Sequence, residues 1–507
     1  MDIDIARLAP FRVRIRTSAA ASAALGTTGR VRKAVRAATS ERNAQNAQQR
    51  RDDTHGIPAV KWVTLFRIPV ADSHPIDVQT ASDVSAPAPT FLFQSKPMQR
   101  MFAAFGYRDF RVQWFGACTS SVGSQTQFAA QSWMVLSLTG SAFFLGLDTF
   151  LQQLPIILFM LVGGVLADRR DRRKTLIGSQ YVQMTTATLL GLLVFSGAVR
   201  IWEILALSFA TGCAQAFGGP AYQALIPELV HKRDLPNAVA FNGIQVNIAR
   251  FLGPLAFGAT ITVAAWLHYN DQQGMALCFL VNALSFLVVI YTLMSLHVKH
   301  IPSSSRGRMS DELKIGLSYV FAHGDIVALT VLAAATTFLA FAVLTFLPVF
   351  TQNVFHQGAG TYSTLLAFSA AGSVLGSMTV AWLGKFKRMG MTSLFVQAAL
   401  GFVVVGFAMS RTIWISEILL FVMGAFMMIV FSTTTSLVQL IAPNEMRGRV
   451  MSIYMVAFRG GMPLGSLTSG YVATLIGAPT VVVINGVLLV CVALYFMLAG
   501  NRRIREI

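Results

Sequence analysis

The feature that most constrains the fold is a series of apolar stretches, each close to the roughly 20 residues that a helix needs to cross a bilayer. Twelve of them follow one another after residue 111, at 112–137, 142–167, 175–198, 201–226, 237–266, 275–296, 326–352, 361–384, 390–410, 413–441, 450–476 and 481–499. Short segments of alternating hydropathy, typical of membrane barrels, are absent from the sequence. The sequence therefore predicts an all-α membrane protein with twelve transmembrane helices.

Composition excludes a soluble protein. Hydrophobic residues make up 54% of the 507-residue chain and charged residues only 12%, about half of the roughly 25% found in ordinary soluble domains. The sequence holds no H-E-x-x-H, no G-x-S-x-G and no P-loop, and its four cysteines show neither disulfide nor zinc spacing. We expect no enzyme activity, no cofactor and no metal site.

The first 98 residues differ from the rest. They carry 14 basic and 8 acidic side chains and no long apolar run, so residues 1–98 are predicted to be a disordered or misassigned extension. Met98 and Met101 open a segment typical of a natural start, and we expect translation to begin there. The remainder divides into a first half at 101–296, a linker at 297–325, and a second half with the tail at 326–507.

The basic residues are distributed unevenly between the two sides of the predicted membrane. Connections after the even-numbered helices, together with the C-terminal tail, carry 19 Lys and Arg, whereas the other connections carry only Arg200 and Arg411. Because Lys and Arg stay on the cytoplasmic side during insertion, we expect a multi-pass protein of the inner (cytoplasmic) membrane with both termini in the cytoplasm. Topology thus explains the net charge of +18 without nucleic acid as a partner.

The linker contains a short amphipathic segment. Ser310 is a suitable helix cap and Asp311 and Glu312 suit a first turn. The pattern fits an interfacial helix between two membrane halves and, equally, a cytoplasmic start of the seventh transmembrane helix.

Two spacings recur six helices apart, which indicates an internal repeat. A tryptophan precedes a glycine by ten residues in both the fourth and the tenth stretch, and an arginine precedes Pro-Leu by four in both the fifth and the eleventh: these are Trp202–Gly212, Trp414–Gly424, Arg250–Pro254 and Arg459–Pro463. The repeats predict two pseudo-symmetric six-helix bundles with a substrate cavity between them near mid-membrane.

Ionisable and amide side chains inside the membrane are candidates for that cavity. A charged residue at the centre of a helix costs at least about 2.5 kcal/mol, so Arg250, Arg459 and Asp148 are expected to face a cavity, a coupling site or a bracing partner. The amides assigned with them to the substrate cavity or to coupling are Gln127, Gln215 and Asn247. Gly253, Pro254 and Pro463 are assigned to helix packing.

The connection between the second and third stretches reads GGVLADRRDRRKTL over residues 163–176. A glycine pair allows close helix approach, and an acid at the membrane edge among five cations suits charge-assisted hydrogen bonds. This segment resembles the signature loop of the major facilitator superfamily, and it matches at Gly164, Leu166, Ala167, Asp168, Arg169, Arg172, Arg173 and Lys174. Asp171 replaces the usual glycine, as in the subgroup of drug and siderophore exporters that includes the enterobactin exporter.

The resemblance implies the major facilitator fold and alternating access by rocking of two halves. It also implies a cytoplasmic conformational latch formed by Gly164, Asp168, Arg169, Arg172 and Arg173. Two departures bear on coupling: residues 210–215 lack the arginine that proton-coupled drug antiporters carry, and residues 384–388 lack the acid of the second latch copy.

These observations predict a monomeric secondary active transporter, driven by an ion gradient, that exports a small amphipathic molecule of siderophore or drug type. Its partners are the substrate, a coupling ion such as the proton, and the lipid bilayer. A metabolite importer and a lysophospholipid flippase of the same fold remain open. A sensor or scaffold that does not transport is the alternative from another class, and packing of Gln215, Asn247 and Arg250 into apolar surroundings would favour it.

Overall fold

The computed structural model describes residues 102–169, 171–297, 309–384, 386 and 388–498, and within these it does not describe the side chains of 160–169 and 309–314. The predictions for residues 1–98 and for the side chains of Gly164, Asp168 and Arg169 lie outside the described part.

In the first half, six long helices follow one another: α3 (Arg108–Thr139), α4 (Ala142–Arg169), α5 (Arg172–Phe195), α6 (Ile201–Leu225), α7 (Leu235–Trp266) and α8 (Asp271–Met294). The second half contains α10 (Gly324–Val349), α11 (Ala359–Leu383), α12 (Met389–Met409), α13 (Ile413–Ile441), α14 (Arg447–Ile476) and α15 (Ala478–Leu498). Short turns accompany them: η1 (Ala103–Gly106), η2 (Ile226–Glu228) and the π-helical η3 (Phe350–Val354). The prediction of twelve membrane helices is confirmed.

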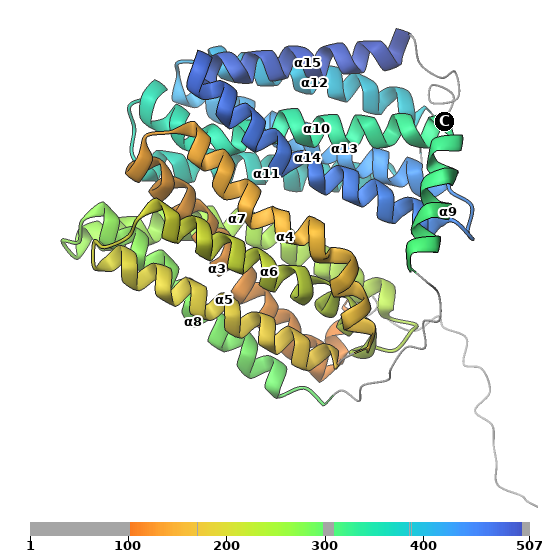
Figure 1. Ribbon diagram of the computed structural model, residues 1–507, viewed down its shortest axis with the longest axis horizontal. Coiled ribbons are helices and arrows are strands. Elements are labelled where there is room, and N and C mark those ends of the chain that lie inside the picture. The colour runs from red at the N-terminus through yellow and green to blue at the C-terminus, as the bar shows by residue number, and fades with distance from the viewer. Residues whose placement is uncertain (1–101, 170, 298–308, 385, 387, 499–507) are drawn as a thin grey trace, which may run out of the picture. The chain divides into compact units, whose positions relative to one another are not determined.

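Helix α9 (Met309–Ala322) connects the halves and runs across the ends of α10 and α14 (Figure 1). Val320 on this helix is buried in the core beneath it, and Gly316 faces Arg449 and Ile453 of α14. The structure therefore contains a helix where the linker pattern predicts one, and its position at the membrane interface stays a prediction.

The two halves are built on the same packing scheme. In the first half α3 packs on α7, α4 on α6 and α5 on α8, and in the second half α10 packs on α14, α11 on α13 and α12 on α15. Figure 1 shows the two sets as separate groups of helices, one coloured orange to green and the other teal to blue. The pseudo-symmetric six-plus-six arrangement is thus confirmed.

The repeated tryptophan and glycine occupy equivalent places in the two bundles. A Cβ on Gly212 would lie 2.2 Å from the Gln152 carbonyl oxygen of α4, and a Cβ on Gly424 would lie 2.0 Å from the Ser369 carbonyl oxygen of α11. Each glycine therefore allows close approach of the fourth helix of a bundle to its second. Trp202 and Trp414 lie at the beginnings of α6 and α13 and are 68% and 76% exposed. An exposed tryptophan at a helix end suits a membrane interface.

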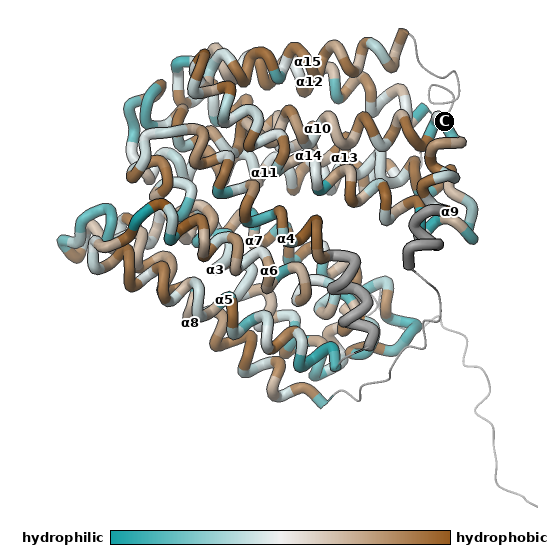
Figure 2. The backbone as a smooth tube through the Cα atoms, in the orientation of Figure 1, coloured by the Kyte–Doolittle hydropathy of each residue, from teal (hydrophilic) through white to brown (hydrophobic). Residues whose placement is uncertain are grey.

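Not all twelve helices are equally apolar. In the described residues, nine helices are long and apolar enough to cross a membrane, and α3, α5 and α14 are not among them. Figure 2 shows hydrophobic residues along the helices and hydrophilic ones gathered at many of the connections. Each of the three more polar helices contributes at least one side chain to the cavity described below.

The helix ends fall into two sets. We call the "basic end" the side that holds the connections α4–α5, α6–α7, α8–α9, α11–α12 and α13–α14, and the "opposite end" the side that holds the others. At the opposite end one hydrophobic core runs through both bundles and includes Trp133, Phe257, Phe346 and Tyr362. At the basic end each bundle has its own core, one around Leu225 and the other around Leu437. The bundles are therefore joined at the opposite end and separate at the basic end.

Candidate functional site: a polar cavity between two bundles

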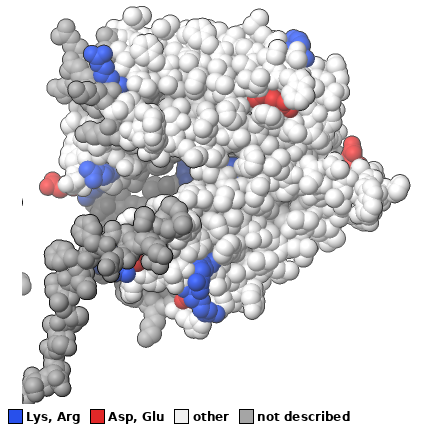
Figure 3. All heavy atoms as spheres, turned by 180° about the vertical axis from the view of Figure 1, so that it is seen from behind, with Lys and Arg blue, Asp and Glu red and all other residues white. Residues whose placement is uncertain are grey.

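A cavity of about 740 Å³ lies on the basic side of the joined core. It is lined by all six helices of the first bundle, α3 to α8, and by Arg459 of α14 from the second. In Figure 3 a hollow opens between the bundles, with basic residues visible inside it. The volume lies within the range of pockets that hold small organic ligands, about 300–1,000 Å³.

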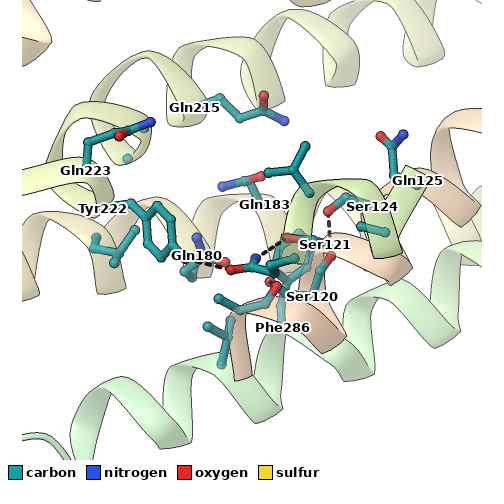
Figure 4. Close-up of a pocket in the computed structure, with 18 of the residues that line it drawn as sticks. Ser120, Ser121, Ser124, Gln125, Gln180, Gln183, Gln215, Tyr222, Gln223 and Phe286 are labelled. Carbon is teal, nitrogen blue, oxygen red and sulfur yellow. Dashed lines mark hydrogen bonds between the residues drawn. The ribbon is translucent and has the colours of Figure 1, made fainter. Parts of the chain in front are cut away.

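The lining is unusually rich in neutral polar groups. Its amides, hydroxyls and cations are Gln113, Ser120, Ser121, Ser124, Gln125, Gln180, Gln183, Gln215, Tyr222, Gln223, Gln245, Arg250 and Arg459. Figure 4 shows Gln215 from α6 and Gln183 from α5 reaching into the same space, with Ser124 from α3 at its side. Apolar wall is supplied by residues such as Ile156 and Phe286, so the cavity suits a molecule with both polar and apolar parts.

A hydrogen-bonded network fixes part of this lining. The Tyr222 hydroxyl lies 2.8 Å from the Gln245 Oε1, and the Gln245 Nε2 donates to the Ser121 hydroxyl at 3.0 Å, as Figure 4 shows. The chain of contacts joins α6, α7 and α3. Because their partners hold them in place, these side chains present a preorganised surface to a ligand.

Arg250 and Arg459 come from repeat-related helices, α7 and α14, and both line the cavity. Neither forms an ion pair within the described residues, and both side chains are exposed to the cavity. The two guanidinium groups act on each other electrostatically. The structure thus places these two arginines where the sequence predicts a cavity, together with Gln215.

The opposite end of the cavity is closed by contacts between the bundles. The Trp133 and Tyr362 rings of α3 and α11 stack with centroids 5.6 Å apart, and the Ser363 hydroxyl donates to the Pro254 carbonyl of α7 at 2.7 Å. On the other side of the joined region, a Cβ on Gly146 of α4 would lie 2.3 Å from the Ser466 carbonyl oxygen of α14. We call the Trp133, Pro254, Tyr362 and Ser363 contacts the opposite gate.

The residues assigned to helix packing lie in close contacts. A Cβ on Gly253 would lie 2.3 Å from the Gln125 Cβ, and the Gly253 carbonyl accepts a hydrogen bond from Thr126 at 3.1 Å. Pro463 is buried inside α14. Pro254 belongs to the opposite gate, where its carbonyl accepts a hydrogen bond from the Ser363 hydroxyl of the other bundle.

Asp148 is buried away from the cavity lining, within the first bundle. Its carboxylate accepts hydrogen bonds from the Gln131 Nε2 at 2.9 Å and from the Ser208 hydroxyl at 2.5 Å. Within the described residues no cation pairs with it. A buried carboxylate that neutral donors alone satisfy is a site where a proton can be gained or lost.

Two predicted cavity amides lie elsewhere. Gln127 is buried between helices, and its Oε1 accepts from the Asn282 Nδ2 of α8 at 2.6 Å. Asn247 donates to the Gly243 carbonyl of its own helix at 3.1 Å and is not part of the cavity lining. Gln245, two residues before Asn247, lines the cavity instead. A shift of two positions turns a helical side chain by about 200°, which accounts for this difference.

Sequence reasoning missed a second buried acid. Glu417 of α13 is 7% exposed, and its Oε1 accepts from the Thr364 hydroxyl of α11 at 3.4 Å. Its only sequence signal is an acid four residues inside an apolar stretch. Asp148 and Glu417 thus lie at the second-to-fourth helix contact of their respective bundles.

Two arginines in the described part of the signature loop contact other helices of the first bundle. Arg172 pairs with Glu228 at 2.5 Å, and Arg173 donates from Nε to the Leu293 carbonyl at 2.7 Å. These contacts tie α5 to the ends of α6 and α8.

Known proteins share both sequence and fold with this chain. It is 26% identical to a staphyloferrin A transporter of Staphylococcus aureus over 74% of this chain and 91% of the relative. It is 22% identical to macrolide efflux protein A of Streptococcus pyogenes over 76% and 94%, and 24% identical to an enterobactin exporter of Citrobacter koseri over 80% and 93%. These relatives confirm the resemblance to siderophore and drug exporters.

A solved bacterial homologue of the human lysosomal transporter Spinster, in an inward-facing unoccupied conformation, superimposes with a TM-score of 0.62 at 15% identity, covering 81% of this chain and 98% of that one. Residues 99–506 match the family of transmembrane secretion effectors. The chain therefore belongs to this family, within the major facilitator superfamily of membrane transporters.

Proposed function

We propose that this protein is a secondary active exporter that carries a small amphipathic molecule from the cytoplasm outward by alternating access. The observation that carries the proposal is the cavity itself, polar within, open towards the basic end and closed at the opposite gate. If the basic end is cytoplasmic, as the Lys and Arg distribution favours, this conformation receives substrate from the cytoplasm.

The names of the relatives support the direction and the substrate type. Two of the three are described as an efflux protein and an exporter, and two act on siderophores. An amphipathic molecule of siderophore or drug type also suits a lining that combines glutamines with apolar side chains. Importer and flippase alternatives share the fold and are separated from export by the direction of transport.

A non-transporting scaffold of the same fold is the alternative from another class. Gln215 and Arg250 face the cavity and not packed apolar surroundings, which favours a transporter. Asn247 turns to its own helix and supports neither alternative.

We assign ion coupling to Asp148. It is 6% exposed and lies in the part of α4 nearest the opposite end, and neutral donors alone contact it in the described structure. Proton binding there would remove a buried charge beside α6, and release would restore it. Coupling through Asp148 would take the place of the arginine-dependent coupling of proton-driven drug antiporters, because residues 210–215 contain no arginine.

The signature loop is proposed to latch the basic end when the protein opens outward. In the present conformation Arg172 and Arg173 hold α5, α6 and α8 together. Closing of this end would bring Gly164, Asp168 and Arg169 to the second bundle.

The experiment that tests transport measures direction in vesicles. Everted and right-side-out membrane vesicles are supplied with radiolabelled enterobactin or a radiolabelled macrolide and energised by respiration. Export predicts accumulation in everted vesicles that an uncoupler abolishes. Accumulation only in right-side-out vesicles would support import, and movement in neither orientation would favour the scaffold.

Conformational exchange provides a second test. Spin labels replace Lys232 and Glu445 on the basic end, or Arg200 and Arg411 on the opposite end, after Cys118, Cys213, Cys278 and Cys491 are changed to alanine. Alternating access predicts two distance populations for each pair of labels. When the distance at the basic end is short, the distance at the opposite end should be long, and the reverse. A single fixed distance in both pairs would contradict the proposal.

A further inference from the structure

The charge of the cavity lining is one-sided. Two arginines and seven glutamines line it, and among the described lining residues no Asp or Glu is present. Amides and hydroxyls contribute no net charge, so the lining carries two positive charges. A cation would be repelled here, whereas an anion would gain electrostatic attraction.

The two charges stand on opposite sides of the seam between the bundles. Arg250 lies four residues before Pro254 in α7, and Arg459 lies four residues before Pro463 in α14, so they are the same position of the repeat. Each bundle therefore contributes one guanidinium group to a shared space. Since like charges repel, this pair favours the separated basic ends that the structure shows.

The cavity also holds polar groups that lack partners. Both the Oε1 and Nε2 of Gln113 are without a hydrogen bond, although the side chain is only 3% exposed, and the Gln180 Oε1 is also unpartnered. A buried polar group without a partner is costly. Gln113 and Gln180 line the same cavity as the arginines, so a turn of these side chains towards the cavity would let the carbonyl and hydroxyl groups of a ligand satisfy them.

We infer that the cavity selects an organic anion with at least two negatively charged oxygen groups, which Arg250 and Arg459 bind from opposite bundles. This inference rests on the proposed transport function and specifies its substrate class. The planar guanidinium fork binds carboxylate and phosphate oxygens through two parallel hydrogen bonds. A ligand with one anionic group bound to each arginine would span the seam between the bundles.

Binding of such an anion has a consequence for the transport cycle. It replaces repulsion between the arginines with attraction of both to the ligand, and so lowers the cost of bringing the basic ends together. A ligand shifts a conformational equilibrium only through its different affinity for the two conformations. Here the difference comes from the second arginine, which reaches the ligand fully only when the bundles close.

The experiment uses citrate, a tricarboxylate, and trimethyl citrate, its uncharged ester of similar shape. Binding to the purified full-length protein in nanodiscs is measured by isothermal titration calorimetry at low salt. The inference predicts that citrate binds at least about ten-fold more tightly than the ester, and that Arg250→Gln or Arg459→Gln weakens citrate binding by about ten-fold. Arg447→Gln removes the same charge from an exposed position of α14 outside the cavity and should leave binding unchanged.

The closing step is read with the spin-label pair at positions 232 and 445. Citrate should increase the short-distance population in the unmodified protein and in Arg447→Gln, and should not do so in Arg250→Gln or Arg459→Gln. Arg250→Lys retains the charge without the guanidinium fork, so this variant should retain part of the affinity for citrate. Each variant that still shows two distance populations without ligand is folded.

The outcomes separate the inference from the function on which it rests. Equal binding of citrate and its ester, no binding of either, or citrate binding that survives both glutamine substitutions would overturn the anion selectivity while the two-ended exchange of distances still stood. Absence of that exchange in the unmodified protein would instead count against alternating access.

Discussion

The Ser208 hydroxyl of α6 lies 2.5 Å from the Asp148 carboxylate of α4, and the same hydroxyl accepts a hydrogen bond from the Gln131 Nε2 of α3 at 2.7 Å. Three helices of the first bundle therefore meet at one buried carboxylate. Because a serine hydroxyl can both donate and accept, Ser208 can reverse its hydrogen bond to Asp148 when the carboxyl group gains a proton. This relationship links a proton site to the packing of α4 on α6.

The first prediction concerns Asp148→Asn. If this carboxylate carries the coupling proton, the amide mimics its neutral form, and transport should lose its dependence on an imposed pH gradient while downhill exchange of substrate persists. Proteoliposomes with a defined internal and external pH measure both activities.

Glu203→Gln is the matched control for that prediction, because Glu203 is an acid at the start of α6 that accepts from the Arg200 backbone amide as a helix cap. It should retain the response to the gradient. An Asp148→Asn protein that still concentrates substrate in response to the pH gradient would remove Asp148 from the coupling route.

The second prediction concerns the glycines of the repeat. Gly424→Ala would place a Cβ 2.0 Å from a backbone carbonyl oxygen of α11, so the helices must separate. We expect a loss of about 1–3 kcal/mol in the free energy of unfolding, as for other overpacked interiors. Unfolding in mixed micelles, followed by circular dichroism as denaturing detergent increases, measures this change.

Gly243→Ala provides a comparison of opposite sign. No atom lies within 4 Å of the Cβ position there, and alanine in a helix is favoured over glycine by about 0.5–1 kcal/mol. Equal stability changes in the two variants would mean that the α11–α13 contact does not depend on the missing Cβ.

The fold was accessible from sequence because the bilayer imposes one length on every span. Even α3, α5 and α14, which fall short of the hydropathy of the other nine spans in the described residues, were recognisable from their place in the series. The tryptophan and glycine spacing indicated the repeat because both bundles need the same close approach at Gly212 and Gly424.

The site was only partly accessible, since hydropathy does not show which face a helix turns to its neighbours. The cost of burying a charge in the membrane singled out Arg250 and Arg459, and both line the cavity. An amide has no such preference: Gln127 bonds to Asn282, whereas Gln215 faces the cavity. Glu417 was missed because an acid at the start of a span is as consistent with a hydrated interface as with burial.

The third prediction concerns pH and stability outside the membrane spans. The Tyr107 hydroxyl donates to the Asp234 carboxylate at 2.7 Å, and this bond lowers the pKa of Asp234. A carboxyl group whose pKa is lower in the folded than in the unfolded protein stabilises the fold above the unfolded value, about 4. That contribution is lost as the pH falls through the lower, folded value.

Unfolding measured between about pH 3 and pH 7 should therefore show a decline at the acid end that Asp234→Asn reduces. The same bond raises the pKa of Tyr107, so its contribution is also lost at strongly alkaline pH as the tyrosine ionises. Tyr107→Phe should reduce both effects. Acid sensitivity unchanged in both variants would show that this contact adds nothing to stability.

The fourth prediction concerns the signature loop. Asp168→Asn keeps the size of the side chain but removes its charge, so it should weaken the latch and slow transport without changing membrane insertion. Initial rates in vesicles, normalised to the amount of inserted protein, measure the effect. Asp171→Asn is the neighbouring control, because Asp171 caps α5 and its side chain accepts from the Lys174 amide. Equal transport rates in the unmodified protein and in Asp168→Asn would argue against a latch at position 168.

The fifth prediction concerns the opposite gate. Tyr362 of α11 stacks on Trp133 of α3, and this contact crosses between the bundles, so it must break when the opposite end opens. Aromatic pairs contribute about 0.5–1.5 kcal/mol beyond the area they bury. Tyr362→Ala should therefore shift the equilibrium towards opening of this end by roughly ten-fold, seen as growth of the long-distance population between labels at positions 200 and 411.

Tyr362→Phe keeps the ring and should stay close to the unmodified protein, as should Tyr291→Ala, because Tyr291 is 75% exposed on the outer face of α8. A distribution in Tyr362→Ala that matches these two controls would mean that the stacked pair does not hold the gate closed, and that the α4–α14 contact at Gly146 carries the closure instead.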